Sequence, residues 1–295
     1  KLDMDGGINV TGSHNPPQYN GFKVLVGRDA IFGKAIQQIR KIAESKKFFD
    51  PPAQAKKSEK AKGKNGKAGK TLSGGEMHGN VGEKNIDAIY LQEIASKVKV
   101  PRKLKVVVDA GNGMASELGP ALLRMLGCDV IELYCEKIPG YPNHIPDPSQ
   151  EKNVAELKRQ VVAQKADIGI AFDGDVDRLG VVDEKGSLLY GDRLLGVLAK
   201  RALGEKPGAK IVFEVKCSQA LGEYIRSLGG KPIMWKTGHS LIKAKMKEEG
   251  AALGGEMSGH MFFALGWYGF DDALLAAAKV IEIVAQSKKK VSEIA

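Results

Sequence analysis

Three short runs of the sequence combine residue types that could carry out phosphoryl transfer. The run Thr11-Gly-Ser-His-Asn-Pro-Pro17 presents a serine hydroxyl in a loop shaped by glycine and two prolines. The run Asp173-Gly-Asp-Val-Asp-Arg178 places three carboxylates two residues apart, and Gly255-Glu-Met-Ser-Gly-His260 alternates a carboxylate, a hydroxyl and an imidazole. Together they supply a hydroxyl that can carry a phosphoryl group, ligands for a hard cation, and polar groups suited to a sugar.

The three aspartates follow the apolar run 167–172, which predicts a buried strand. An extended segment turns alternate side chains to one side, so Asp173, Asp175 and Asp177 are expected to face a single ion. Carboxylates held this close repel one another and require a counter-charge. A hard divalent cation with oxygen ligands, Mg²⁺ by preference, would supply it. An acidic surface turn without a metal is the alternative.

Ser13 is the candidate for the reactive hydroxyl. The alternatives are a capping or turn serine, and the nucleophile of a Ser-His-Asp hydrolase. The second is disfavoured because Ser13 lacks the Gly-x-Ser-x-Gly elbow and because adjacent side chains at Ser13 and His14 project differently. Lys23, in the run Asn20-Gly-Phe-Lys23, could neutralise a phosphate or move a proton, or could be an ordinary surface lysine.

Glu256, Ser258 and His260 alternate along one glycine-flanked loop, which suits the vicinal hydroxyls of a sugar ring. His260 could equally satisfy a hydrogen bond in the core, and His239 carries the same ambiguity. The run Asp109-Ala-Gly-Asn-Gly113 resembles a dinucleotide-binding loop only weakly, since it lacks the third glycine, and it is interpreted as a tight turn.

The elements that must position these runs alternate between strand and helix patterns, which predicts α/β layers. Strand patterns precede the candidate loops, and a plausible hairpin turns at residues 183–186. Predicted strands cover residues 7–11, 104–108, 129–134, 167–172, 179–182, 187–190, 210–215 and 232–235. Predicted helices cover residues 30–48 and 85–98, a segment ending near 126, segments around 154–161 and 194–199, and residues 221–228, 241–248 and from 271 onward.

Composition narrows the class of protein. The chain of 295 residues carries a net charge of +10, of which seven lysines and one glutamate between Gln54 and Lys70 account for +6. That tract has no aromatic residue for base stacking, so it is interpreted as a solvated loop and nucleic-acid binding is not expected. No apolar run is long enough to span a bilayer. Three cysteines without a CxxC pair favour the cytoplasm.

With these motifs in this order, the chain resembles the α-D-phosphohexomutase family, specifically its bacterial phosphomannomutase/phosphoglucomutase group. The resemblance covers nearly the whole chain except the lysine tract. It implies successive three-layer α/β domains with mixed sheets and an active-site cleft between them. Residues 1–100 would be the C-terminal part of domain 1, residues 101–187 domain 2 with the metal loop, and residues 188–295 domain 3 with the sugar-recognition loop.

The resemblance also implies the reaction and its residues. The family interconverts hexose 1-phosphates and hexose 6-phosphates of mannose or glucose through a phosphoserine and a 1,6-bisphosphate, with Mg²⁺ as cofactor and glucose 1,6-bisphosphate as activator. The substrate partner would be a hexose phosphate, and no membrane partner is expected. The implied catalytic residues are Ser13, His14, Lys23, Arg178 and His239; the substrate-binding residues Lys216, His239, Glu256, Ser258 and His260; and the metal ligands Asp173, Asp175, Asp177 and an oxygen of phosphorylated Ser13.

Three departures from the family pattern affect these expectations. Val176 stands where the family usually has glycine, which disfavours a positive φ there. The start of domain 1 and all of domain 4 are expected to be absent, so this piece should bind Mg²⁺ but turn over sugar phosphate poorly. The alternatives are a phosphoglucosamine mutase and a sugar-phosphate-binding piece without catalytic activity.

Overall fold

The computed structural model describes residues 4–13, 15, 18–27, 29–46 and 82–295. The chain divides into two compact units, one formed by residues 1–31 together with 89–295 and the other by residues 32–88. The second unit contains α1 (Lys34–Ser45), which is shorter at both ends than the predicted helix over residues 30–48. The lysine tract at 54–70 lies outside the described residues, so its predicted loop stays a prediction.

The first sheet of the larger unit is small and antiparallel. It contains β1 (Gly6–Val10), β2 (Phe22–Val26) and β3 (Asp29–Ala30) in that order. In the register of β1 and β2, Asn9 lies opposite Lys23. The loop with Ser13 connects these two strands, so Ser13 and Lys23 are brought to the same end of the hairpin. The sequence analysis missed β2 and β3.

The second sheet has five strands in the order β5-β4-β6-β7-β8. The strands β4, β5 and β6 are parallel, and β7 and β8 join antiparallel as the predicted hairpin. All five residues of β6 are buried, which explains its continuous apolar sequence. The bounds are β4 (Lys105–Asp109), β5 (Asp129–Leu133), β6 (Ile168–Phe172), β7 (Leu179–Val182) and β8 (Leu188–Leu189).

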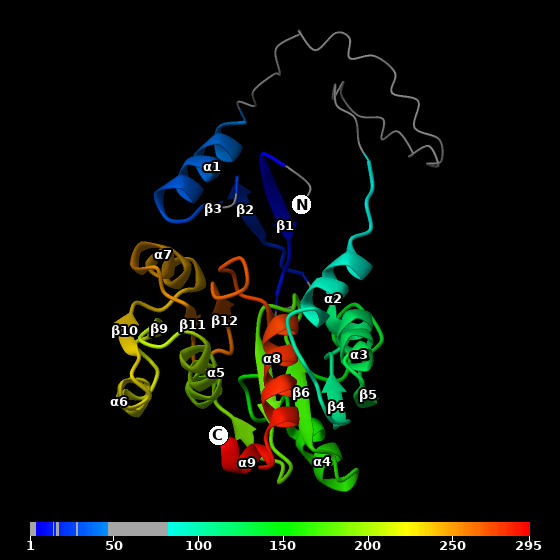
Figure 1. Ribbon diagram of the computed structural model, residues 1–295. Coiled ribbons are helices and arrows are strands. Elements are labelled where there is room, and N and C mark those ends of the chain that lie inside the picture. Colours follow the sequence, from blue (N-terminus) through cyan, green and yellow to red (C-terminus); the bar gives the residue numbers. More distant parts are fainter. Residues whose placement is uncertain (1–3, 14, 16–17, 28, 47–81) are drawn as a thin grey trace, which may run out of the picture. The chain divides into compact units, whose positions relative to one another are not determined.

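Helices cover both faces of this sheet, so it is the middle of three layers (Figure 1). Alternate residues of β4 separate the two cores: Val106 and Val108 belong to the cluster shared with α3 (Ala115–Met125), whereas Val107 packs with Leu157 of α4 (Ala155–Ala163). The predicted tight turn after β4 is present, since Gly111 N donates to Asp109 Oδ1 at 2.9 Å and Gly111 and Asn112 both have positive φ. The α2 helix (Asp87–Ala95) precedes this sheet.

The third sheet has four strands in the order β10-β9-β11-β12, with only β12 antiparallel to its neighbour. Its core is likewise divided: Ile211 and Phe213 of β9 pack with α5 and α6, and Val212 packs with Ile242 of α7. The bounds are β9 (Lys210–Glu214), β10 (Lys231–Trp235), β11 (Leu253–Gly255), β12 (Met261–Phe263), α5 (Gly191–Glu205), α6 (Gln219–Ser227) and α7 (His239–Glu249).

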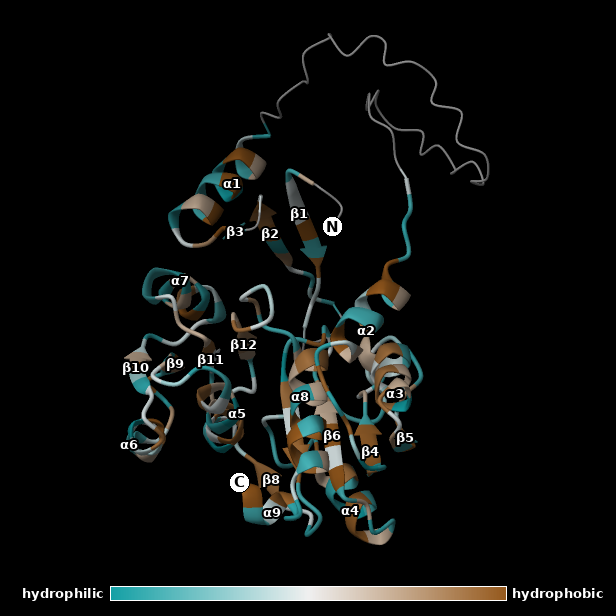
Figure 2. Ribbon diagram, in the orientation of Figure 1, coloured by the Kyte–Doolittle hydropathy of each residue, from teal (hydrophilic) through white to brown (hydrophobic). Residues whose placement is uncertain are grey.

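The α8 helix (Ala273–Gln286) ties the second and third sheets together. It packs against α3, α5 and β7, and nearly all of its residues are buried. In Figure 2, α8 mixes apolar and hydrophilic residues, and its apolar residues belong to the same core cluster as those of β6. Asp272 caps its N-terminus by accepting a hydrogen bond from Leu275 N at 2.9 Å. Apolar residues of α8 and of both sheets belong to one cluster, so the two sheets share a continuous core. The short α9 (Val291–Ile294) follows α8.

The α/β fold with mixed sheets, predicted from the sequence, is confirmed. The predicted domain boundaries stay a prediction. The sequence analysis also missed β11 and β12, which are three residues each and too short for periodicity to reveal. Within the described part of the chain, no helix is long and apolar enough to cross a membrane.

Candidate active site at the aspartate loop

The aspartate loop (residues 173–178) follows the buried end of β6 as a tight turn, not as the extended segment that the alternation suggested. Asp173 Oδ1 accepts hydrogen bonds from Asp177 N at 3.0 Å and Arg178 N at 3.1 Å. Val176 has φ of +67°, so the chain adopts a left-handed conformation even though a β-branched residue stands there. The turn brings the three carboxylates together. The sequence analysis expected the same grouping from an extended segment, and that reason was wrong.

The three carboxylates lie close enough to hold one metal ion, with an oxygen of each within 4.8 Å of the others. Lys23 Nζ lies between two of them, 2.7 Å from Asp175 Oδ2 and 2.6 Å from Asp177 Oδ2. Burial and the charges of Asp177 and Asp175 raise the pKa of Asp173 well above its usual value. Burial also opposes the ionisation of Asp177, but His260 and Lys23 lower its pKa nonetheless.

The loop between β1 and β2 that contains Thr11 and Ser13, here called the serine loop, contacts the aspartate loop directly. Ser13 Oγ donates to Asp173 Oδ2 at 3.2 Å, and Thr11 Oγ1 donates to Asp175 Oδ2 at 2.9 Å. The backbones meet at Gly174, where a Cβ would lie 2.1 Å from the carbonyl oxygen of Ser13. Only glycine permits this approach, so Gly174 couples the two loops. His14, predicted as a catalytic residue, lies outside the described residues.

The candidate sugar-binding residues Glu256, Ser258 and His260 lie in the turn between β11 and β12, here called the sugar loop. The other two side chains contact the ring of His260. His260 Nδ1 is 2.9 Å from Glu256 Oε2 and 3.0 Å from Ser258 Oγ, and Nε2 is 3.2 Å from Asp177 Oδ1. Burial alone would lower the pKa of His260, but its two carboxylate partners raise it to about 9. The hydrogen bond from Glu256 N to His260 O closes the turn at 3.0 Å. A turn, and not the predicted extended alternation, brings the three side chains together.

Arg178 links the two loops. It forms an isolated β-bridge with His260, and its Nε lies 3.4 Å from His260 Nε2. The guanidinium also lies 3.9 Å from Asp173 Oδ2 and 4.0 Å from Asp177 Oδ1. Since the guanidinium keeps its charge at any ordinary pH, it offsets part of the negative charge of the loop and leaves donors for a phosphate.

His239 occupies the first turn of α7 and faces His260, with ring centroids 5.8 Å apart and nearly parallel planes. Its Nδ1 lies 3.7 Å from Asp271 Oδ2, which is too far for a hydrogen bond. Burial lowers the pKa of His239. Gly238 N, at the same helix start, donates to Glu256 Oε1 at 2.7 Å, so the His239 and His260 segments are held together.

Lys216 is the predicted site residue with the weakest connection to the others. Its side chain is 63% exposed, and its ammonium lies 3.8 Å from Glu214 Oε2. Glu214 is buried, and its other oxygen accepts from Met257 N at 2.7 Å. Lys216 is therefore connected to the sugar loop through Glu214 and makes no direct contact with Ser13 or the aspartates in the described part of the chain.

The buried side-chain atoms without a hydrogen-bond partner mark the site. Among the described residues they are Asp175 Oδ1, Glu214 Oε2 and His239 Nδ1, together with Asp177 Oδ1, which has an ion-pair contact with His260 but no well-aligned hydrogen bond. All four atoms belong to this region. Unsatisfied acceptors on two neighbouring carboxylates fit a divalent cation with oxygen ligands. Asp177, His260 and Asp271 form a second close group. Its imidazole already pairs with two carboxylates, and a hard cation prefers the all-oxygen set of the three aspartates. The three aspartates are the better metal site.

Sequence reasoning missed four residues that shape this site: Thr11, Gly174, Glu214 and Asp271. Thr11 and Gly174 lie inside the quoted motifs, so their side-chain types were visible but their contacts were not. Glu214 is the last residue of β9, one residue before the end of the predicted strand, and Asp271 begins a predicted helix. A charged residue at the end of an apolar strand is a usable signal in α/β proteins, because ligands bind at the carboxyl ends of strands.

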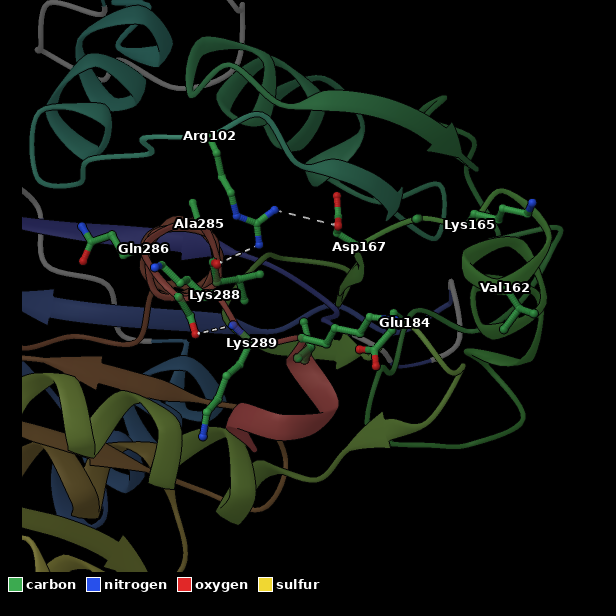
Figure 3. A pocket seen from close by; sticks show the side chains of 14 residues that line it. Arg102, Val162, Lys165, Asp167, Glu184, Ala285, Gln286, Lys288 and Lys289 are labelled. Carbon is green, nitrogen blue, oxygen red and sulfur yellow. Dashed lines mark hydrogen bonds and ion pairs between the residues drawn. The ribbon is translucent and has the colours of Figure 1, made fainter.

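A cavity of about 740 Å³ lies at the opposite end of β6 from the aspartate loop. Arg102, Asp167, Glu184 and Lys288 are among its lining residues (Figure 3). Arg102 donates to the carbonyl of Val284 at 3.1 Å, which satisfies the end of α8, and Glu184 accepts from Ser292. None of the predicted site residues lines this cavity, so its size does not bear on the chemistry described above.

Three family models match the chain, described as domains I, II and III of the α/β/α phosphoglucomutase/phosphomannomutase family. They match residues 1–50, 88–186 and 190–295, respectively. A phosphomannomutase/phosphoglucomutase of Pseudomonas aeruginosa is 44% identical over 98% of this chain and 57% of its own length. A phosphoglucomutase of Neisseria meningitidis is 43% identical over 95% of this chain and 56% of its own length.

Solved structures give the same result. A phosphoglucomutase/phosphomannomutase family protein of Burkholderia thailandensis superposes with a TM-score of 0.87 at 41% identity, covering 99% of this chain and 58% of that one. The chain thus spans a little over half the length of the relatives it matches.

Proposed function

This chain belongs to the phosphoglucomutase/phosphomannomutase family, and from that membership we propose that the full-length protein interconverts a hexose 1-phosphate and its 6-phosphate through a phosphorylated Ser13. The observation that carries the proposal is the position of the Ser13 hydroxyl, 3.2 Å from Asp173 in a cluster of three carboxylates. A serine so placed would present its phosphoryl group beside a divalent cation. Glucose or mannose is the proposed sugar.

The proposed reaction has two transfers. The substrate hydroxyl attacks the phosphorus of phosphorylated Ser13; the Ser13 Oγ–P bond breaks, a sugar O–P bond forms, and the hydroxyl proton passes to a base. The product of this step is a hexose 1,6-bisphosphate. The bisphosphate then reorients in the site and Ser13 Oγ attacks its other phosphorus; that sugar O–P bond breaks, the Ser13 Oγ–P bond forms again, and the freed sugar oxygen takes up a proton. Glucose 1,6-bisphosphate would act as an activator by phosphorylating Ser13 in the same way.

Asp173, Asp175 and Asp177 are the proposed ligands of Mg²⁺, together with an oxygen of phosphorylated Ser13. Bound there, Mg²⁺ would offset the charge that develops on the transferred group. Arg178 would hold the phosphoryl group from the other side with its guanidinium. Thr11 and Gly174 would keep the serine loop against the ligands.

The two histidines suit different parts in proton transfer. His239 has a lowered pKa and is neutral near pH 7, so it is the proposed base for the substrate hydroxyl. His260, held as an imidazolium by Asp177 and Glu256, is the proposed donor to the sugar, with Glu256 and Ser258 accepting its hydroxyl hydrogens. Lys216 is the proposed contact for the phosphate that is not transferred, and Glu214 would orient it.

The proposal can be tested by intact mass and phosphopeptide mapping of the full-length protein after incubation with glucose 1,6-bisphosphate and Mg²⁺. We expect one added phosphoryl group on Ser13, which is lost when glucose 6-phosphate or mannose 6-phosphate is added in excess. Ser13→Ala should remain unphosphorylated, while the matched control Ser227→Ala, on the exposed end of α6, should still gain the group. A folded wild-type protein that binds Mg²⁺ but gains no phosphoryl group would contradict the mechanism.

A further inference from the structure

Lys23 lies at the position expected for a cation. Its ammonium is 2.7 Å from Asp175 Oδ2 and 2.6 Å from Asp177 Oδ2, so it bridges one oxygen from each of two neighbouring carboxylates. These two residues, with Asp173, form the group close enough to hold a metal ion. The lysine comes from β2 of the antiparallel sheet, whereas the carboxylates follow β6 of another sheet. The contact therefore does not follow from sequence proximity.

The site gives Lys23 room to leave. Its side chain is 33% exposed, whereas those of Asp175 and Asp177 are 7% and 12% exposed. A flexible four-carbon stem with a solvated side can swing away at little cost. The carboxylates are held by other contacts as well: Asp173 by backbone hydrogen bonds, Asp175 by Thr11 Oγ1 and Asp177 by His260. The carboxylates thus form the fixed part of the site and the ammonium the movable part.

We propose that Lys23 and a divalent cation occupy the space between Asp175 and Asp177 in turn, so that metal binding releases the Lys23 ammonium. The inference rests on the proposed function for the presence of the metal. A small divalent ion bound to these carboxylates would bring like charges within a few ångströms, because its ligand distances are shorter than those of the ammonium. Lys23 is then the counter-ion that keeps the loop folded when no metal is bound.

The released ammonium would serve a different purpose in the loaded site. Freed from Asp175 and Asp177, Lys23 becomes available to the phosphoryl group at Ser13, whose loop begins at the end of β1 opposite β2. Metal binding would thereby provide two positive charges for the phosphoryl group at Ser13, that of the cation and that of the released Lys23. Without metal, the lysine remains bound to the carboxylates and is not available to the phosphate.

The first test compares metal affinity in the full-length protein by isothermal titration with Mg²⁺. If Lys23 competes for the site, Lys23→Met should bind Mg²⁺ about tenfold more tightly than wild type, because a like charge has been removed. The matched control Lys210→Met removes an ammonium that lies 2.7 Å from Glu249. Glu249 belongs to neither group of possible metal ligands, so the affinity should stay nearly unchanged. Equal or weaker binding by Lys23→Met would overturn the proposal.

The second test needs no substitution. An ammonium shielded between two carboxylates reacts slowly with an amine-acylating reagent, so peptide mass spectrometry should find Lys23 labelled several-fold faster with saturating Mg²⁺ than with a chelator. Lys210, whose ammonium lies 2.7 Å from Glu249, serves as the internal reference. Slower or unchanged labelling of Lys23 would mean that it stays on the carboxylates beside the metal, and would overturn the proposal.

The two proposals fail in different ways. Phosphorylation of Ser13 together with unchanged Lys23 labelling would overturn exchange and leave the mutase function intact. Faster Lys23 labelling on metal binding, with no phosphorylation of Ser13, would support exchange and contradict the mutase mechanism. If neither the wild type nor Lys23→Met binds Mg²⁺, exchange is overturned together with the proposed metal ligands.

Discussion

The His144–Asp109 pair and the group of His260 with its two carboxylates differ in how completely the polar atoms around them are satisfied. His144 Nε2 lies 3.0 Å from Asp109 Oδ2, and its Nδ1 bonds the carbonyl of Ile145 at 2.9 Å. Asp109 also accepts from Gly111 N. In the second group, His260 lies between Asp177 Oδ1 and Glu256 Oε2. Asp175 Oδ1 and His239 Nδ1, in the same site, are buried without a hydrogen-bond partner.

The difference separates a structural histidine from a functional one. Both histidines have raised pKa values, so ionisation does not distinguish them. The His144 pair leaves no donor or acceptor of its own for a ligand, whereas the His260 group borders oxygen and nitrogen atoms that await partners. An incomplete hydrogen-bond network in a buried site therefore indicates function more strongly than a shifted pKa does.

The largest expected effect comes from His260→Gln in the full-length protein. We expect mutase kcat/KM to fall by roughly a hundredfold or more, because the imidazolium is lost as a proton donor and sugar contact. Activity should be measured per folded molecule, with thermal unfolding in parallel. Full specific activity accompanied by a large loss of stability would place His260 in the structural class with His144.

The next effect concerns the contact between the loops. Gly174→Ala would place a Cβ 2.1 Å from the carbonyl oxygen of Ser13, so the serine and aspartate loops must separate. We expect mutase activity to fall by about tenfold to a hundredfold, since small displacements of reacting groups are costly. Phosphorylation of Ser13 by glucose 1,6-bisphosphate should slow in proportion. Gly204→Ala, where nothing lies near the added Cβ, is the matched control.

Substitution of His144, in the pair with Asp109, should change the stability of the protein and not its activity. His144→Gln is expected to lower the free energy of unfolding by about 2 kcal/mol at pH 6, the range for hydrogen bonds to charged groups. Burial lowers the pKa of His144, but the hydrogen bond and charge of Asp109 raise it overall above 6.5. The stabilisation is thus complete below pH 6.5 and is lost as the pH rises through the folded-state pKa.

Urea unfolding of wild type and His144→Gln at pH 6 and pH 9 measures this change. The difference between the two proteins should shrink at the higher pH, while the specific activity per folded molecule stays near that of wild type. A difference that grows with pH would show that the charged pair is not the source of the stability.

The smallest effect is expected at Val176, whose φ of +67° is unfavourable for a β-branched residue. Val176→Gly relieves about 1–3 kcal/mol of strain but loses packing and adds unfolded-state entropy, so the net change should be small. Val176→Ala loses the packing and keeps the strain. We therefore expect Val176→Gly to unfold at a higher temperature than Val176→Ala. At most positions alanine is the more stabilising of the two residues.

Much of the fold was predictable because it depends on local patterns. The apolar run before Asp173 predicted β6, and residues 183–186 predicted the hairpin of β7 and β8. The short strands β11 and β12 were missed because three residues show no periodicity. The grouping of Asp173, Asp175 and Asp177 was expected for the wrong reason, since a turn with a left-handed Val176, and not an extended strand, brings them together.

The sequence by itself determined the residue types of the site and their order, because a motif carries its chemistry in its side chains. Only the tertiary structure decided which of these residues meet. Lys23 bridges Asp175 and Asp177 across about 150 residues, and Glu214 holds Met257 across roughly 40 residues, by distances that no spacing encodes. It also distinguished His144 from His260, since the completeness of a hydrogen-bond network depends on every segment packed around it.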